Sequence, residues 1–259
     1  MVRMLLERND VDPNKGDLLG TTALLWASKG AHEGVVRMLL ERNDVDPNKR
    51  GFFRKTPLWH ASYHGHEEVL RILLERNDVD PNKGDLFGTT PLLSASGGGH
   101  EGVVRILLER NDVDPSKGNL IGATPLLSAS GGGHAGVVRI LLERNDVDPN
   151  KGSLVYGTPL LLASGGGHEG VVRILLERND VDPNKGSLVC GTPLLLASGG
   201  GHEGVVRILL ERNDVDPNKG GLLGATPLSL ASYNWHVAVV WMLLEWEEAN
   251  PTNRRISSA

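Results

Sequence analysis

The sequence predicts an all-α chain, a solenoid of helix-turn-helix repeats that are joined by hairpin-like loops. The first observation is a series of Asp-Pro pairs that recurs every 34 residues, as from Asp46-Pro47 to Asp80-Pro81. The second is the composition: with 39% hydrophobic residues, 4% aromatic residues and 33 glycines, the chain has few large apolar side chains for a single globular hydrophobic core. The third is a Thr-Pro step in six of the repeats, which is typical of a helix start.

Residues 85–118 contain the elements that we expect in one repeat. Thr90-Pro91 starts a short helix over 92–96, and three glycines at 97–99 end it. A second helix begins at His100-Glu101, and its apolar face consists of Val103, Val104, Leu107 and Leu108. Its opposite face should carry a solvated ion ladder of Glu101, Arg105 and Glu109. Neither helix is long enough to be stable alone, so neighbouring repeats must bury the apolar faces.

The 34-residue step sets the expected domain organisation. We expect one array over residues 1–254, with a half repeat at 1–16, repeats starting at 17, 51, 85, 119, 153, 187 and 221, and a tail at 255–259. Residues 153–186 and 187–220 differ only at Tyr156 and Cys190, which indicates recent duplication. Because 1–8 repeats 35–42 except at Met1, the chain opens inside a second helix, and we expect a fragment of a longer protein or a short gene derived from one.

One family pattern is present in these residues. Residues 85–96 read Asp-Leu-Phe-Gly-Thr-Thr-Pro-Leu-Leu-Ser-Ala-Ser, and 99–108 read Gly-His-Glu-Gly-Val-Val-Arg-Ile-Leu-Leu. This resembles the ankyrin repeat, D-x-x-G-x-T-P-L-H-x-A-A-x-x-G-H-x-x-V-V-x-x-L-L, over essentially residues 1–254. The resemblance implies stacked helix pairs with a binding groove lined by first helices and hairpin tips. The loop sequence Arg-Asn-Asp-Val-Asp-Pro-Asn resembles, more narrowly, ankyrin arrays of large fungal intracellular receptor-like proteins.

The chain departs from the ankyrin pattern at two positions. The resemblance assigns the histidine of Thr-Pro-Leu-His to hydrogen bonds that steady the hairpin, but that position here holds Leu25, Trp59, Leu93, Leu127, Leu161, Leu195 and Ser229. We therefore expect packing to anchor the hairpins. The glycine of the Gly-x-Thr step is replaced by Arg54, Tyr156 and Cys190, so the tips of those three repeats should differ in geometry.

Charge and hydropathy exclude two classes of partner. Lys and Arg number 27 against 32 Asp and Glu, and the net charge of −5 has no basic block, so we expect no nucleic-acid partner. No run approaches the 18 or so apolar residues of a membrane span, so we expect no membrane partner. The single cysteine excludes an intramolecular disulfide and fits a reducing compartment, which predicts a cytoplasmic location.

Four kinds of binding or catalytic site are suggested by short motifs, but each lacks residues or a structural context that it requires. Residues 97–102 match Gly-x-Gly-x-x-Gly but follow a helix, whereas a dinucleotide site needs a preceding strand. The Asp112-x-Asp114 loop lacks the glycine and the bidentate glutamate of a calcium loop, so we interpret it as a structural turn. His60 and His64 lack further ligands for zinc and should be helix-surface histidines, and Cys190 has no acid–base partner. We expect no cofactor, no metal and no enzymatic activity.

The hairpin tips are apolar in all seven repeats, where family members usually carry polar residues. We expect the first member of each pair to pack inward and the second to face solvent, which would form an apolar ridge along the groove. The pairs are Leu18-Leu19, Phe52-Phe53, Leu86-Phe87, Leu120-Ile121, Leu154-Val155, Leu188-Val189 and Leu222-Leu223.

These observations predict a protein-binding module whose partner, another protein of unknown identity, contacts the hairpin tips and the concave first-helix face. The alternative is a self-assembling structural array, such as a homodimer, that pairs through the apolar tips or through the Trp-rich C-terminal end. There, Trp241 and Trp246 occupy the positions of Arg207 and Arg212 one repeat earlier. The predicted partner-binding residues are Trp26, Phe53, Trp59, His60, Tyr63, His64, Phe87, Ile121, Tyr156, Cys190, Leu223, Tyr233 and Trp235.

Overall fold

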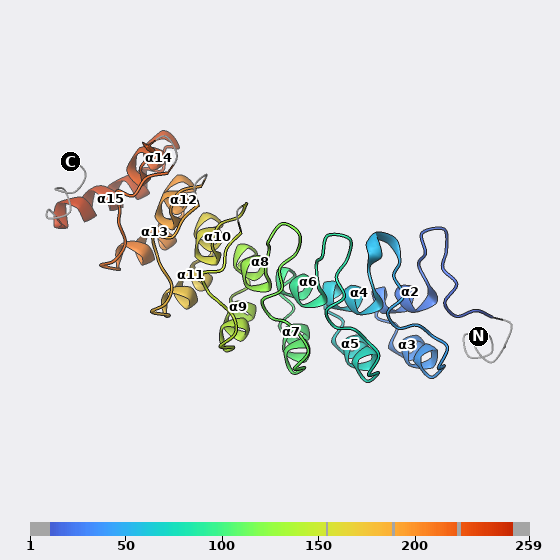
Figure 1. Ribbon diagram of the computed structural model, residues 1–259. Helices are drawn as coiled ribbons and strands as arrows, with labels where there is room; N and C mark the ends of the chain where they lie inside the picture. Colours follow the sequence, from blue (N-terminus) through green and yellow to red (C-terminus); the bar gives the residue numbers. More distant parts are fainter. Residues whose placement is uncertain (1–10, 154, 188–189, 222–223, 251–259) are drawn as a thin grey trace. The chain divides into compact units, whose positions relative to one another are not determined.

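The computed structural model describes residues 11–153, 155–187, 190–221 and 224–250, and within these segments the fold consists of fourteen α-helices and one short 3-10 helix, without strands (Figure 1). Ser153 and Ser187 form isolated antiparallel bridges with Gly157 and Gly191. The chain divides into two compact units, residues 1–120 and 121–259, which we call the N-terminal and C-terminal units and describe separately. The all-α class is therefore confirmed, and the single array over 1–254 stays a prediction.

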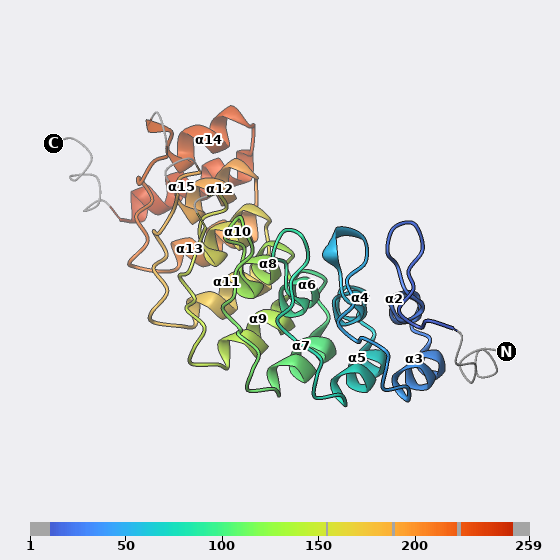
Figure 2. The ribbon, with the colours of Figure 1, turned by 45° about the vertical axis from the view of Figure 1, so that its right-hand side comes forward.

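The N-terminal unit contains three helix pairs. Its first helices lie in one row and its second helices in another, and the hairpin tips extend beyond the first-helix row (Figures 1 and 2). The first helices pack on each other from repeat to repeat, and each also packs on its own second helix. The elements are α2 (Ala23–Lys29), α3 (Glu33–Leu40), η1 (Phe52–Arg54), α4 (Pro57–His64), α5 (Glu67–Leu74), α6 (Pro91–Gly97) and α7 (Glu101–Leu108).

The C-terminal unit contains four helix pairs with the same pairing of neighbours. Its last helix is the longest, because it continues for more than a turn past the point where the other second helices end. The elements are α8 (Pro125–Gly131), α9 (Ala135–Leu142), α10 (Pro159–Gly165), α11 (Glu169–Leu176), α12 (Pro193–Gly199), α13 (Glu203–Leu210), α14 (Pro227–Tyr233) and α15 (Val237–Ala249).

The first helices begin where the sequence predicts. Thr90 is extended, and its hydroxyl oxygen accepts a hydrogen bond of 3.2 Å from the Leu93 backbone N–H, while Pro91 occupies the first turn, where no intrahelical donor is needed. The same threonine cap starts the other first helices, including α2, which has Ala23 instead of proline. These local signals fix the register of every helix pair.

The core lies between the two rows of helices. In α7, Val103, Val104 and Leu107 are buried as predicted, but Ile106 is also buried and Leu108 is only half-buried. The buried arc is wider than one helix face because α7 is covered by its own first helix and by the second helix of the neighbouring repeat. The prediction that Leu108 belongs to the core was therefore wrong, and Ile106 is a core residue that was not predicted.

The recurring histidine at the start of each second helix joins successive repeats. The Nε2 atom of His100 lies 3.0 Å from the backbone oxygen of Tyr63, and since a carbonyl only accepts, Nε2 carries the proton. His66, His168, His202 and His236 make the equivalent bond to the preceding repeat. A β-carbon on Gly65, whose φ is +74°, would lie 2.6 Å from His100 Nδ1. Gly65, Gly133, Gly167 and Gly201 therefore provide backbone freedom and space for the imidazole of the next repeat.

The Asp-Pro-Asn loops form a second connection between repeats. The Asn48 side-chain amide donates to the Asp78 carbonyl at 2.6 Å, and its oxygen accepts from the Asp80 N–H at 2.9 Å. Asn14, Asn82, Asn150 and Asn184 make the same pair of bonds. The Asp-x-Asp carboxylates are also engaged, because Asp112 pairs with Arg110 and Asp114 accepts from the Ser116 N–H. The structural-turn interpretation of this loop is confirmed.

Candidate functional site

Both members of each described tip pair are exposed, so the prediction that the first member packs inward was wrong. Leu86 is 46% exposed and Phe87 is 56% exposed, and the pairs at 18–19, 52–53 and 120–121 are exposed as well. The reason lies in Asp85, whose Oδ1 accepts from the Phe87 and Thr89 N–H groups at 2.9 Å and folds the tip into a turn with both apolar residues at its apex. Leu154, Leu188, Val189, Leu222 and the predicted site residue Leu223 lie outside the described residues.

Packing anchors the hairpins, as predicted. Six of the seven residues in the position of the family histidine are buried, and only Ser229 is exposed. Leu25 is 1% exposed, and a β-carbon on Gly51 of the next tip would lie 2.8 Å from its Cδ1. Backbone hydrogen bonds add to this packing, because the Leu86 N–H donates to the Phe53 carbonyl at 2.8 Å and the Leu120 N–H donates to that of Phe87 at 3.0 Å. Neighbouring tips in the N-terminal unit are therefore tied to one another.

The tip of the repeat that starts at 51 has its own geometry. Arg50 stands where the neighbouring repeats have Gly16 and Gly84, whose hypothetical β-carbons would lie within 3 Å of the backbone of their own tips. The side chain of Arg50 therefore excludes the ordinary tip. Phe53 takes a left-handed φ of 54°, and Arg54 has a φ of 61° at the position where Gly20 and Gly88 are left-handed in the neighbouring tips. Non-glycine residues in this region carry strain, and such strain is common at functional sites.

The tips of the repeats that start at 153 and 187 differ in another way. Ser153 replaces aspartate, its Oγ accepts from the Tyr156 N–H at 2.9 Å, and the left-handed residue moves one position onward to Gly157. Cys190 occupies the same position as Tyr156 and donates its N–H to Ser187 Oγ. Tyr156 is exposed and Cys190 is half-buried. The predicted change of geometry at Arg54, Tyr156 and Cys190 is confirmed.

An exposed group of rings, Trp26, Phe52, Phe53, Tyr63 and Phe87, lies on the tips and first helices of the N-terminal unit, and we call it the aromatic face. Lys55 Nζ lies 3.8 Å from the centre of the Trp59 ring, which stacks on Tyr63 at 5.1 Å. Lys29 Nζ lies 5.1 Å from the Trp26 ring. Phe53 stacks on Phe87 of the next repeat at 6.3 Å. Rings of this kind, with few rotatable bonds, are the side chains that dominate protein-binding hot spots.

Trp59 corrects the predicted set of surface anchors. It is only 4% exposed, and its indole N–H donates to the Thr89 carbonyl at 3.1 Å. Its face supports Tyr63 and Lys55 from below, so it positions exposed groups and does not itself form the surface. Sequence reasoning gave no weight to Lys29 and Lys55, although their position beside aromatic residues in the helix and tip could have indicated them.

The two predicted surface histidines of α4 have different environments. His64 is exposed, whereas His60 is half-buried and its Nδ1 has no hydrogen-bond partner among the described residues. Burial, together with the charges of Lys55, His64 and Lys29, lowers the pKa of His60 to about 4. Burial and the nearby His66, Lys29, His100 and Lys55 also lower the pKa of His64. In the described segments, no three His, Cys, Asp or Glu residues come together as a metal site would require.

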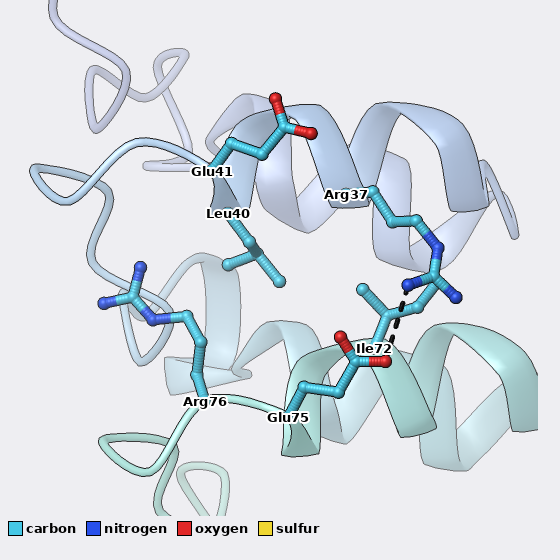
Figure 3. Close-up of a pocket in the computed structure, with 6 residues that line it drawn as sticks. All are labelled: Arg37, Leu40, Glu41, Ile72, Glu75 and Arg76. Carbon is cyan, nitrogen blue, oxygen red and sulfur yellow. Dashed lines mark hydrogen bonds and ion pairs between the residues drawn. The ribbon is translucent and has the colours of Figure 1, made fainter.

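A groove of about 360 Å³ lies between second helices α3 and α5, lined by Leu40, Ile72 and four charged residues (Figure 3). Arg37 pairs across it with Glu75, and also with Glu68. Arg37 thus pairs with acidic residues of the next repeat. The ladder predicted for Glu101, Arg105 and Glu109 stays a prediction. A similar groove of about 460 Å³ lies between α13 and α15. Because it recurs with the repeat and is open to solvent, we interpret it as a gap between neighbouring helices.

The C-terminal end exposes Tyr233, Trp235 and Trp241, whereas Trp246 is half-buried. The Trp246 indole N–H donates to the Leu210 carbonyl at 3.1 Å, as Arg212 donates to Leu176 one repeat earlier at 3.0 Å. This tryptophan thus replaces an arginine hydrogen bond to the preceding second helix. Trp235 has a φ of +62° at a position held by glycine in the five preceding repeats.

These features define the class of protein. A sequence model described as "Ankyrin repeats (3 copies)" matches residues 1–85, 43–119, 77–153, 111–187 and 160–255, so the chain belongs to the ankyrin repeat family. Domains of this class are generally protein–protein interaction modules and typically non-catalytic, and no catalytic domain was identified. No helix in the described segments is long and apolar enough to cross a membrane.

Solved structures support the same class, with 503 matching chains. One is the ankyrin repeat domain of human ASB11, which has a TM-score of 0.76 and 26% sequence identity, and the match covers 87% of this chain and 98% of that one. A search of curated proteins found no match. The narrower resemblance to fungal receptor-like arrays has no support in these comparisons.

Proposed function

We propose that this ankyrin domain is a non-catalytic module that binds a partner protein through its hairpin tips and first-helix face. The aromatic face of the N-terminal unit supports this proposal. It exposes five large rings on neighbouring repeats, whereas the scaffold beneath it is closed by buried leucines and by hydrogen bonds between repeats. Exposed aromatic side chains on a rigid support are the arrangement that protein-binding surfaces use.

The other predicted site residues take secondary roles in this proposal. Ile121 and Tyr156 are exposed on tips of the C-terminal unit, and Cys190 contributes a half-buried thiol to a third tip. His60 and Trp59 support the exposed residues of α4 from within. We also place the domain in the cytoplasm, because its single cysteine fits a reducing compartment.

Quantitative affinity capture from a lysate of the source organism tests the module. The triple variant Phe53→Ser/Tyr63→Ser/Phe87→Ser should lose at least about 90% of the proteins retained by the wild type, since truncating several hot-spot rings costs several kcal/mol. The matched control is Tyr233→Ser/Trp241→Ser, which removes exposed rings from the C-terminal end and should retain the wild-type set. Equal capture by the wild type and the triple variant would contradict the proposal.

A specific observation keeps self-assembly as a second candidate. Tyr233, Trp235, Val237 and Trp241 form a concentration of exposed apolar residues on α14, α15 and their connection. A symmetric pair of chains could bury this surface. Light scattering at micromolar concentration should give a monomer under the leading proposal. A dimer that becomes a monomer in Tyr233→Ser/Trp241→Ser would instead favour assembly.

A further inference from the structure

Two lysines, Lys29 and Lys55, lie beside rings of the aromatic face. Lys55 Nζ lies over the buried Trp59 ring and 5.8 Å from the Tyr63 ring, and Lys29 lies over Trp26. Within the described part of the chain neither ammonium group forms an ion pair. Burial lowers the pKa of Lys55, and the charge of Asp85 only partly opposes this effect. Asp85 is already engaged, because it accepts hydrogen bonds from two N–H groups of its own tip.

The acidic residues in the helices of the N-terminal unit are confined to the second-helix row, which also carries arginines. The first helices α2, α4 and α6 contain no Asp or Glu, and their basic residues are Lys29, His60 and His64. The acidic residues of the helices lie in the second row, where Glu68 and Glu75 pair with Arg37. The tips beside these helices add Asp17 and Asp85 against Arg50, Arg54 and Lys55, so the first-helix side together with its tips keeps a positive balance, although the chain has a net charge of −5. Such a surface favours an anionic partner.

The same surface also requires an apolar component from its partner. Tyr63 is 53% exposed and stacks on the buried Trp59 ring, and Phe53 and Phe87 form a stacked pair on adjacent tips. A binding partner that covered only the lysines would leave these rings in water. Two lysines also fall short of the row of cations with which proteins neutralise a nucleic-acid backbone. The chemistry favours a peptide that carries both carboxylates and apolar side chains.

We propose that the face formed by Lys29, Lys55, Tyr63, Phe53 and Phe87 binds an acidic segment of the partner protein. Asp or Glu side chains of that segment pair with Lys29 and Lys55, and an aromatic or aliphatic side chain between them packs on Tyr63 or on the Phe53–Phe87 pair. This inference rests on the proposed protein-binding function and specifies the chemistry of the partner. The lysines are held over rings before binding, so the segment meets cations that are already positioned.

Peptide selection on the immobilised full chain tests the inference and requires no identified partner. The probe is a phage-displayed library of random peptides. We expect the selected peptides to be enriched in Asp and Glu together with Phe, Leu or Trp. The charge variant Lys29→Gln/Lys55→Gln should bind the best peptide at least about tenfold more weakly, since it removes two charge-assisted contacts. Replacing the peptide's carboxylates by amides should weaken binding to the wild type by a similar factor.

The control variant is Lys49→Gln/Lys83→Gln, which removes the same charge from the Asp-Pro-Asn-Lys loops of the same unit. Its affinity for the peptide should stay within about twofold of the wild type. Circular dichroism establishes that both variants fold. The proposal of an acidic segment would be overturned if the selected peptides were neutral or basic, or if Lys29→Gln/Lys55→Gln bound the best peptide as tightly as the wild type. In either case the capture experiment could still support a protein-binding module. Failure of both experiments would overturn the module itself.

A nucleic-acid partner is the other outcome that this design separates. A fluorescent single-stranded oligonucleotide of uridine is titrated into the wild type in competition with the best acidic peptide. We expect no displacement of the peptide at micromolar oligonucleotide. Displacement that is lost in Lys29→Gln/Lys55→Gln would assign the cations to phosphate and reject the acidic segment.

Discussion

The first helices of the N-terminal and C-terminal units have the same caps and nearly the same length, but they present different surfaces. At one recurring position the N-terminal unit has Trp26, His60 and Ser94, whereas the C-terminal unit has serine once and then leucine. Three positions further along, the N-terminal unit has Lys29, Tyr63 and Gly97, whereas the C-terminal unit has glycine in three repeats and then Tyr233. The first helices of the N-terminal unit thus expose rings and a lysine, whereas those of the C-terminal unit expose no aromatic ring before Tyr233 in the last repeat.

The two units nevertheless share their internal contacts. The bond from a histidine to the carbonyl one repeat back, the asparagine pair of hydrogen bonds and the bidentate Arg-Asp pair occur in both. In the C-terminal unit, Leu162 and Leu196 lie over Gly131 and Gly165, where a β-carbon would approach within 3.3 Å. Within each repeat, the positions that form the stabilising contacts between repeats therefore differ from the positions that vary on the surface. Stability is a sum over repeats and their interfaces, so the surface can vary without loss of the fold.

Deleting one repeat from each unit should produce the largest effect. Removal of 153–186 or of 51–84 should lower the free energy of unfolding by about 2–5 kcal/mol, at roughly 0.05–0.15 kcal/mol per residue. Urea unfolding followed by circular dichroism measures this loss. Only the deletion of 51–84 should abolish partner capture, because it removes Lys55, Tyr63 and Phe53. Loss of the helical circular-dichroism signal at 20 °C after deletion of 153–186 would contradict the view that stability is a sum over repeats and their interfaces.

The inter-repeat histidines should be equally important in both units. His100→Ala and His168→Ala each leave a backbone carbonyl without its donor and open space beside a glycine. Each should lower the free energy of unfolding by about 2 kcal/mol. The exposed His64→Ala serves as the control and should change stability by less than about 0.5 kcal/mol. A large difference between His100→Ala and His168→Ala in urea unfolding would show that the two scaffolds are not equivalent.

The half-buried imidazole of His60 should give the stability of the N-terminal unit a pH dependence. Its folded pKa of about 4 lies below the ordinary value of 6.5, so the unfolded chain takes up the proton first as the pH falls. The stabilisation is complete above pH 6.5 and is lost as the pH falls from 6.5 toward 4. We expect a loss of about 1–2 kcal/mol, because partial exposure of the ring reduces the full linkage value.

Comparison with His60→Ser isolates the pH-dependent contribution of His60 to the free energy of unfolding. Serine is a suitable replacement because Ser94 and Ser128 occupy the same position in other repeats. The difference in unfolding free energy between wild type and His60→Ser, measured from pH 7 to pH 4, should shrink or reverse in favour of the variant. A constant difference over that range would mean that His60 does not remain neutral in the folded protein.

The strained tip of the repeat that starts at 51 should give the smallest effect. Arg54→Gly places glycine at a φ of 61°, as Gly20 and Gly88 already have at 76° and 78°. We expect stabilisation of about 0.5–1 kcal/mol, because relief of left-handed strain exceeds the entropy that glycine adds to the unfolded chain. Arg71→Gly, inside α5, should instead destabilise by about 1 kcal/mol. Destabilisation by Arg54→Gly would show that the guanidinium group contributes to the tip.

The repeat boundaries, the helix starts and most of the core could be predicted from the sequence. Thr-Pro caps, glycine stops and the Val-Val-x-x-Leu spacing act within one or two helical turns, so each repeat carries its own signal. The apolar character of the tips and the importance of Tyr63 and Phe87 as surface rings were also predicted. The inward packing of Leu86 was predicted wrongly, because the sequence does not show that the Asp85 side chain holds both apex residues away from the core.

By itself, the sequence determined the class of fold and the places where surface residues change, because those features depend on periodicity and local capping. Only the tertiary structure decided that Trp59 is buried while Tyr63 is exposed, since the Trp59 indole bonds to Thr89, 30 residues further along the chain. The same holds for the histidines, whose carbonyl acceptors lie 37 residues earlier. It also holds for Trp246, whose indole N–H donates to the Leu210 carbonyl, 36 residues earlier. Contacts between neighbouring repeats select which of several equivalent side chains reach solvent, and that selection requires the packed helices.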